Sequence, residues 1–325
     1  MKRIWWTWDL RMRWAHGFSA SAESFVSNYS AAIEAAGRYG VEGIVIWGFL
    51  RDSHGGVDAA KQVCEHAESR GVRILPGVGI DAYGGVYYEG DSRYNLDRFL
   101  REHPDLAAKK ADGEPFTFHW PKTDPHDRWA GCPSQPALMD FYAESLDWVM
   151  DTFGLAGFQI EQGDVGLCQC DRCRGRTRTP AAKMPRTCLE DMAARVGPLV
   201  ARAIEKRPDA WVLVENYSGL LPSDAARVGP FLEAFAEEAF HSWQAYDCGK
   251  FFIAEDSRSP APHGCMALRT NNDIFGGELD DRENIRRAVK LARDAGLDMT
   301  YIYGEYPDAW PTTRADYEAW RAAAE

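Results

Sequence analysis

The chain has 325 residues, of which 45% are hydrophobic and 26% are charged, the composition of a globular protein with a large core. Its formal net charge of −12 argues against a nucleic-acid partner and against docking on an anionic membrane surface. No stretch approaches the ~18 uninterrupted apolar residues of a membrane span, so no bilayer-crossing segment is expected either.

The first part of the chain alternates short apolar runs with amphipathic segments. The run from 43 to 48 is apolar throughout, which is typical of a parallel strand buried on both faces. Gly40 and Gly71 mark the expected ends of two helices. Strands are predicted over residues 4–8, 43–48 and 72–78, and helices over residues 22–38 and 57–69.

A long excursion, from about residue 79 to 133, follows the third predicted strand. It contains one short predicted helix, over residues 95–102. Loops of this length inside compact domains are usually functional or disordered. Aromatic residues such as Tyr83, Tyr87 and Trp129 argue against disorder, so we expect a functional loop.

The second half continues the alternation. Helices are predicted over residues 135–152, 188–206, 224–238 and 283–295 and from residue 314, and strands over residues 157–161, 211–215, 240–246, 265–269 and 299–305. Eight strands alternating with helices predict an α/β fold, a single (β/α)8 TIM barrel over residues 1–325. An open doubly wound sheet would need a glycine-rich phosphate loop after the first strand, and residues 9–14 contain no glycine.

Four cysteines gather around the fourth predicted strand. Cys132 precedes it, and Cys168, Cys170 and Cys173 follow it in a C-x-C-x-x-C pattern. Three thiols within six residues cannot all form disulfides without strain, whereas four thiolates make a closed tetrahedral site for Zn²⁺. The spacing therefore predicts a structural zinc site, with a set of free buried thiols as the alternative.

Carboxylates, amides and aromatic rings dominate the carboxyl ends of the predicted strands, where barrel enzymes place their active sites. The candidates selected from these ends and the loops that follow them are Trp8, Trp47, Glu161, Asp164, Glu215, Asn216, Trp243, Asp247, Glu305 and Tyr306. The chain has no H-E-x-x-H motif, nucleophile elbow or Walker loop. Paired carboxylates beside tryptophans suit cleavage of a glycosidic bond, in which one carboxyl protonates the leaving oxygen and another attacks or activates water.

Glu161 ends a central strand and is the leading candidate for the general acid, while Glu305 or Glu215 would be the second carboxylate. The structural alternative for Glu161 is a salt-bridged carboxylate, for example with Arg172 or Arg174. Asp164 would serve as another acid or orient the cysteine loop. The remaining candidates would bind substrate, the tryptophans by stacking on a sugar ring: Trp8, Trp47, Trp243, Asn216, Asp247 and Tyr306.

The segment from Cys132-Pro through residues 157–164 to the C-x-C-x-x-C cluster resembles the zinc-binding segment of family-42 β-galactosidases. The resemblance covers about 45 residues in detail and implies a glycoside hydrolase barrel in which the four cysteines hold zinc. That family has its acid/base glutamate in an Asp-Asn-Glu motif at the end of the fourth strand. Glu161-Gln162-Gly163 replaces the motif here, so the family's glutamate position falls on Gly163.

Two further classes of function stay open. A barrel without a catalytic pair would bind glycans only, and a sugar isomerase or epimerase would need a catalytic divalent metal. Arg11, Arg13 and Arg51 follow the first two strands and would either grip an acidic sugar or form ion pairs at the rim.

The expected partner is an oligosaccharide or glycoside, with association of copies through helical faces as an open option. The amino-terminal segment lacks the apolar core of a signal peptide. The cysteines outside the cluster are scattered, and free thiols without an export signal predict a cytoplasmic location.

Overall fold

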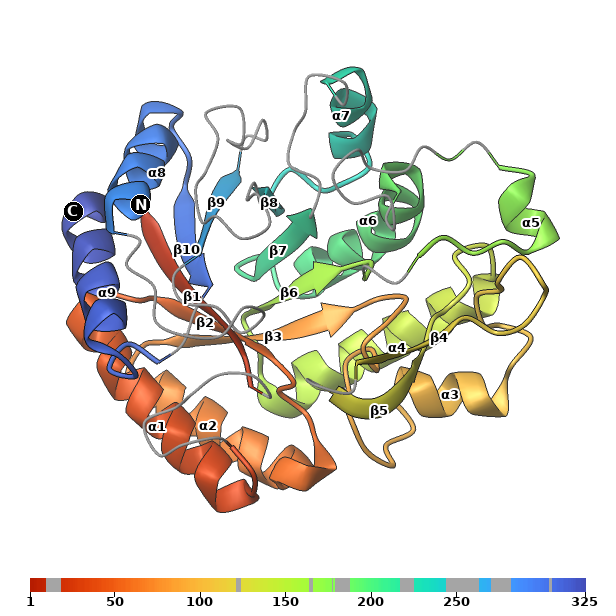
Figure 1. Ribbon diagram of the computed structural model, residues 1–325, viewed down its shortest axis with the longest axis horizontal. Coiled ribbons are helices and arrows are strands. Elements are labelled where there is room, and N and C mark those ends of the chain that lie inside the picture. Colours follow the sequence, from red (N-terminus) through yellow and green to blue (C-terminus); the bar gives the residue numbers. More distant parts are fainter. Residues whose placement is uncertain are drawn as a thin grey trace.

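A parallel β-sheet surrounded by helices forms the centre of the computed structural model (Figure 1). The structure describes residues 1–9, 19–120, 124–163, 166–176, 178, 188–216, 225–243, 263–269, 282–303 and 306–325. The two termini lie close together on one side of the molecule, and Arg3 Nη1 donates to the carbonyl of Arg321 at 3.4 Å. No helix among these residues is both long and apolar enough to cross a bilayer.

The parallel sheet has the strand order β1-β10-β9-β8-β7-β6-β3-β2. Its strands are β1 (Lys2–Trp8), β2 (Gly43–Trp47), β3 (Arg73–Gly79), β6 (Gly157–Glu161), β7 (Trp211–Asn216), β8 (Phe240–Trp243), β9 (Gly264–Arg269) and β10 (Met299–Tyr303). Strand β1 also pairs in parallel with β2, from Ile4 opposite Gly43 to Trp8 opposite Trp47, so the pairing joins the two ends of this order. The predicted α/β fold is confirmed, and the parallel sheet curls in a TIM-barrel-like manner.

Burial on both faces explains why these segments form central strands. All five residues of β2 and all five of β6 are buried. Such near-continuous apolar runs suit parallel strands covered by helices on one face and by the barrel core on the other. Gln159 and Glu161 are the polar exceptions in β6, and both are buried.

The helices follow the predicted ranges within a few residues at most ends. They are α1 (Ala22–Tyr39), α2 (Gly56–Ser69), α4 (Pro136–Phe153), α6 (Leu189–Lys206), α7 (Ala225–Leu232), α8 (Arg282–Asp294) and α9 (Pro311–Ala324). Helix α1 begins at a capping box, in which the Ser21 side chain accepts from the Ser24 N–H, and ends at Gly40 in the left-handed region.

The structure describes the excursion after β3 except for residues 121–123, and the described part contains elements that were not predicted from the sequence. The expected short helix is α3 (Leu96–Glu102). Beyond it, β4 (Thr117–Trp120) and β5 (Asp124–Trp129) form an antiparallel hairpin. A 3₁₀ turn, η1 (Asp52–His54), follows β2, and a one-turn helix, α5 (Asp171–Arg174), lies in the cysteine loop.

The predicted end of α7 at residue 238 is wrong, because this helix ends at Leu232. The chain leaves the helix where the carbonyl of Ala234 approaches Gly197 of α6, and a Cβ at Gly197 would lie 2.4 Å from that oxygen. Close packing of this turn on α6 therefore overrides the helix-forming composition of the segment. The predicted continuations of β8 to residue 246 and of β10 to residue 305 lie outside the described residues.

Candidate active site and metal site

Two glutamates stand next to each other at the carboxyl edge of the sheet. The register that pairs Ile160 of β6 with Val214 of β7 puts Glu161 beside Glu215. Adjacent strands lie about 4.8 Å apart, so the two backbones hold these side chains as neighbours. Both residues are buried, with 1% and 2% of their surfaces exposed. The structure thus brings together two of the three predicted catalytic carboxylates.

Gln159 connects Glu215 to the first two strands. Its Oε1 accepts hydrogen bonds from Trp6 Nε1 at 2.5 Å and from Trp47 Nε1 at 2.6 Å. Its Nε2 donates to Glu215 Oε2 at 2.6 Å. Neither Gln159 nor Trp6 was selected as a site residue from the sequence. The position of Gln159, a polar residue inside an otherwise apolar run, was the signal that could have identified it.

A second chain of hydrogen bonds reaches Glu215 from the opposite side of the barrel. Ser242 Oγ of β8 donates to Tyr301 Oη at 3.0 Å, and Tyr301 of β10 donates to Glu215 Oε2 at 2.5 Å. Ser242 and Tyr301 are fully buried. Neither was predicted, because nothing in the sequence separates inward-facing from outward-facing hydroxyls before the register is known.

Trp8 and Trp47, predicted to bind substrate, lie at the carboxyl ends of β1 and β2. They are 6% and 2% exposed, with ring centroids 6.1 Å apart. Tyr83, in the excursion, packs edge-on against both rings. Trp8 Nε1 also donates to the Tyr88 hydroxyl at 3.3 Å. The start of the excursion therefore covers these two indoles.

The other predicted site residues are described in part. Tyr306 is buried, with its ring 6.2 Å from Trp5. Asn216 ends β7 and Trp243 ends β8, and their strand positions alone are described. Asp164, Asp247 and Glu305 lie outside the described residues.

Of the two roles considered for Arg51, binding an acidic sugar or forming ion pairs, the structure shows ion pairs. It is 5% exposed, and its Nη2 lies 2.9 Å from Glu89 Oε2 and its Nη1 3.9 Å from Asp9 Oδ2. His54 Nδ1 approaches Asp9 Oδ2 to 2.7 Å, and its Nε2 lies 2.9 Å from Arg51 Nη1. These charges tie the ends of β1 and β2 together. Arg11 and Arg13 lie outside the described residues.

Gly163 occupies the position where the family-42 pattern has its acid/base glutamate. Its φ of +101° is in a region that favours glycine. A Cβ at this position would lie 2.7 Å from the Cβ of Ala82. A glutamate therefore cannot occupy this backbone conformation without rearrangement, and Glu161 is the nearest carboxylate of β6.

The four predicted metal-binding cysteines converge. Their sulfur atoms all lie within 4.8 Å of one another. Cys132 Sγ is 3.6 Å from Cys168 Sγ, 3.7 Å from Cys170 Sγ and 3.6 Å from Cys173 Sγ. A tetrahedral ion with four bonds of about 2.3 Å separates its sulfur ligands by about 3.8 Å. The cluster could hold a metal ion.

Donors surround the cysteine cluster and suit a negatively charged thiolate site. The N–H of Lys109 donates to Cys168 Sγ at 3.2 Å, Ser134 Oγ lies 3.0 Å from Cys173 Sγ, and Arg176 Nη2 lies 3.9 Å from the same sulfur. Hydrogen bonding with Cys132 and Cys168 lowers the pKa of Cys173.

Buried ion pairs join the cysteine loop and the excursion to α6. Arg176 and Arg178, beside the cluster, both pair with the buried Asp191 of α6. Arg195, also of α6, donates to Asp81 Oδ1 at 2.9 Å, just beyond β3. Burial raises the pKa of Asp81, and Arg195 opposes that shift. Buried ion pairs thus connect both the cysteine loop and the carboxyl edge of the sheet to α6.

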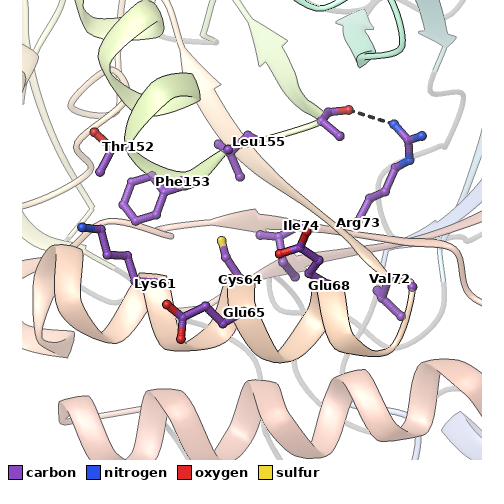
Figure 2. A pocket seen from close by; sticks show the side chains of 13 residues that line it. Lys61, Cys64, Glu65, Glu68, Val72, Arg73, Ile74, Thr152, Phe153 and Leu155 are labelled. Atoms are coloured by element: carbon purple, nitrogen blue, oxygen red, sulfur yellow. Dashed lines mark hydrogen bonds between the residues drawn. The ribbon is translucent and has the colours of Figure 1, made fainter.

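A pocket of about 550 Å³ lies at the opposite end of the sheet (Figure 2). Lys61, Cys64 and Glu65 of α2 face Phe153 at the end of α4 across it, and Arg73 at the start of β3 donates to the carbonyl of Ala156 at 3.1 Å. Its walls belong to the amino end of β3, so it is separate from the glutamate pair.

Solved structures share the fold of this chain. XgtA, an α-glucosyl transfer enzyme, is 12% identical with a TM-score of 0.58, and the alignment covers 93% of this chain and 67% of that one. The GH36 α-galactosidase AgaA from Geobacillus stearothermophilus is 9% identical with a TM-score of 0.56, over 98% of this chain and 41% of that one. An α-galactosidase from Lactobacillus brevis is 11% identical with a TM-score of 0.58, over 99% and 40%.

No family model matches the sequence, and neither does any curated protein. At these identities the structural matches establish the fold alone. The chain spans about two fifths of the length of the two α-galactosidases. The chain therefore shares its fold with an α-glucosyl transfer enzyme and with α-galactosidases, and the comparisons do not establish membership of family 42.

Proposed function

We propose that the chain is a glycoside hydrolase that uses Glu161 as its general acid and Glu215 as its second carboxylate. The observation that supports this most directly is the placement of two buried glutamates side by side at the carboxyl edge of a parallel sheet. Glycosidic bond cleavage needs two carboxyl groups on opposite sides of the scissile bond. The names of the fold neighbours, an α-glucosyl transfer enzyme and α-galactosidases, favour a glycoside or oligosaccharide substrate.

The substrate would bind over the carboxyl ends of the strands. We assign this contact to the set chosen from the sequence, namely Trp8, Trp47, Asp164, Asn216, Trp243, Asp247 and Tyr306. Glu305 is the alternative second carboxylate. Because Trp47 also donates to Gln159, its contribution includes orienting the carboxylate network.

The proposed ion in the cysteine cluster is Zn²⁺, held by Cys132, Cys168, Cys170 and Cys173 in the manner that the family-42 resemblance implies. Four thiolates close the coordination sphere, so the ion would have a structural role. Its residues would tie the excursion to the loop after β6. A thiolate site and free thiols suit a reducing, cytoplasmic compartment.

The proposed enzyme is one (β/α)8 domain over residues 1–325, with the excursion at about 79–133 as an active-site wall. Packing of Tyr83 on Trp8 and Trp47 supports that role for the excursion. Association of copies through the outer helices is compatible with this arrangement.

A glycan-binding barrel without activity is the second candidate, and Gly163 is the observation that favours it. The family's acid/base position carries no side chain here, and its backbone excludes one. A sugar isomerase is less well supported. Among the described residues, the four cysteines form the one cluster suited to a metal, and it is closed by thiolates.

Turnover of a panel of aryl and natural glycosides tests the proposal. Glu161→Gln and Glu215→Gln should each lower kcat by about 10²–10⁴-fold, the usual contribution of a positioned acid or base. Glu102→Gln, on the exposed surface of α3, is the matched control and should retain full activity. Oligosaccharide binding by the wild type without turnover of any glycoside would establish the second candidate instead.

A further inference from the structure

Residues that do not contact Glu215 determine which partner is the donor in the hydrogen bonds that end on its carboxylate. An indole N–H can only donate. Trp6 and Trp47 both donate to the same atom of Gln159, which must therefore be the amide oxygen. The amide nitrogen of Gln159 then has to face Glu215, and Glu215 Oε2 has to accept.

The second chain has the same polarity. The Ser242 hydroxyl donates to Tyr301, which leaves the Tyr301 proton for Glu215 Oε2. Two donors thus meet at one carboxyl oxygen, from β6 on one side and from β10 on the other. The two bonds occupy both lone pairs of Oε2, which leaves Oε1 as the oxygen that could take a proton. Two such bonds also stabilise the charged form of a carboxyl group.

We propose that these two chains keep Glu215 ionised and fixed in orientation, with Gln159 and Tyr301 as positioning residues. Given the proposed function, Glu215 is then the base or nucleophile, acting through Oε1, and Glu161 is the acid. The ionisation of Glu215 itself does not depend on the chain being a glycosidase.

The titratable groups that lie next to Glu215 include Tyr301 and Glu161. Tyr301 contacts it from β10, and Glu161 lies beside it on β6. His241 of β8 points away, toward Phe231 and Phe235 of the helix layer. Glu161 can add a negative charge beside Glu215 in the range where carboxyl groups titrate, and the bonds from Gln159 and Tyr301 favour the ionised form of Glu215 against that charge.

NMR titration of protein labelled with ¹³C at the glutamate carboxyl carbons tests the inference without any substrate. The Glu215 signal is the one lost in Glu215→Gln. Tyr301→Phe removes one donor and keeps the ring, so the pH at which Glu215 is half protonated should rise by about one unit or more. Ser242→Ala should raise it less, because it acts through Tyr301. The control Tyr317→Phe changes a buried tyrosine of α9 and should leave it unchanged.

A Glu215 that is protonated at neutral pH in the wild type, or a midpoint that Tyr301→Phe leaves in place, would overturn the inference. If a substrate is found, the acidic limb of the pH–rate profile should move upward in Tyr301→Phe while the alkaline limb stays. Loss of turnover in Glu215→Gln with an unmoved midpoint in Tyr301→Phe would refute the inference and leave the proposed function intact. The expected midpoint shift in Tyr301→Phe, together with no turnover of any glycoside, would support the inference and contradict the proposed function.

Discussion

Gly163 determines which residue near the end of β6 can present a carboxylate. Its positive φ and its contact with Ala82 reserve the position for glycine. The carboxylate of this strand is therefore Glu161, two residues earlier, whose backbone still belongs to the β6–β3 ladder. A residue inside the ladder is held more rigidly than one in the following loop, which suits a group whose position governs a reaction.

Gly163→Ala should lower the free energy of unfolding by about 1–3 kcal/mol, because it adds a strained backbone conformation and a steric overlap with Ala82. Urea denaturation measures this change. Gly37→Ala is the matched control. Gly37 lies inside α1, and an added methyl group would meet no atom within 4 Å other than those of the adjoining residues and the local helix backbone, so alanine there should stabilise by about 0.5–1 kcal/mol. Equal stability of Gly163→Ala and the wild type would show that the loop relaxes freely.

The sequence was informative about single residues where position along a strand was enough. Glu161 and Glu215 were selected because they end strands, and the cysteines because of their spacing. Gln159, Ser242 and Tyr301 were missed, because their role depends on which face of the strand turns inward and on pairing across the barrel. Those properties follow from register, which local composition does not reveal.

At the scale of elements, β8 packs on α7 and on the turn after it through the buried side chain of His241. His241 is 3% exposed and packs 4.9 Å from the ring of Phe235. Burial lowers the pKa of His241 to about 4. The folded state therefore disfavours the imidazolium form, while the unfolded chain takes up a proton near pH 6.5.

Stability should consequently fall as the pH drops from about 6.5 to about 4, because the unfolded state binds the proton first. The loss attributable to this residue is about 3 kcal/mol once the lower end is reached, and none of it appears above the unfolded pKa. Urea midpoints of the wild type and His241→Leu across this range measure it. The difference between the two proteins should change with pH; a constant difference would contradict a neutral buried His241.

Most elements were predictable because their apolar periodicity matches their burial. The hairpin of β4 and β5 was not, because its sequence is polar and lacks a clean alternation. Its base is held by tertiary contacts instead: Phe118 packs 6.0 Å from Tyr83, and Phe116 lies against Gly166 beside the cysteines. A tertiary contact also explains the early end of α7, because the carbonyl of Ala234, just beyond the helix, packs closely on Gly197 of α6.

For the whole molecule, the cysteine cluster connects two segments that are distant in the sequence. Cys132 closes the excursion, and the other three cysteines lie in the loop after β6. Because the start of the excursion covers Trp8 and Trp47, an ion in this cluster would influence the wall of the proposed active site without touching the reacting atoms.

Elemental analysis of the purified protein should find one zinc ion per chain, which Cys168→Ser and Cys173→Ser should each abolish. Metal loss should increase hydrogen exchange in residues 106–116 and 166–176, while the central strands keep their protection. Cys64→Ser, in α2 and outside the cluster, is the control and should retain the ion. Unchanged metal content in both cluster variants would exclude this site.

Chemical rescue of the two glutamates is the sharpest test of the proposed two-carboxylate mechanism. With a glycoside whose leaving group must be protonated and that the wild type cleaves, Glu161→Ala and Glu215→Ala should each lose about 10²–10⁴-fold in turnover. Added azide or formate should restore part of it, since a small anion can fill the space of the missing carboxylate. Wild-type turnover in either variant would remove that glutamate from the mechanism, and wild-type turnover in both would contradict the mechanism as a whole.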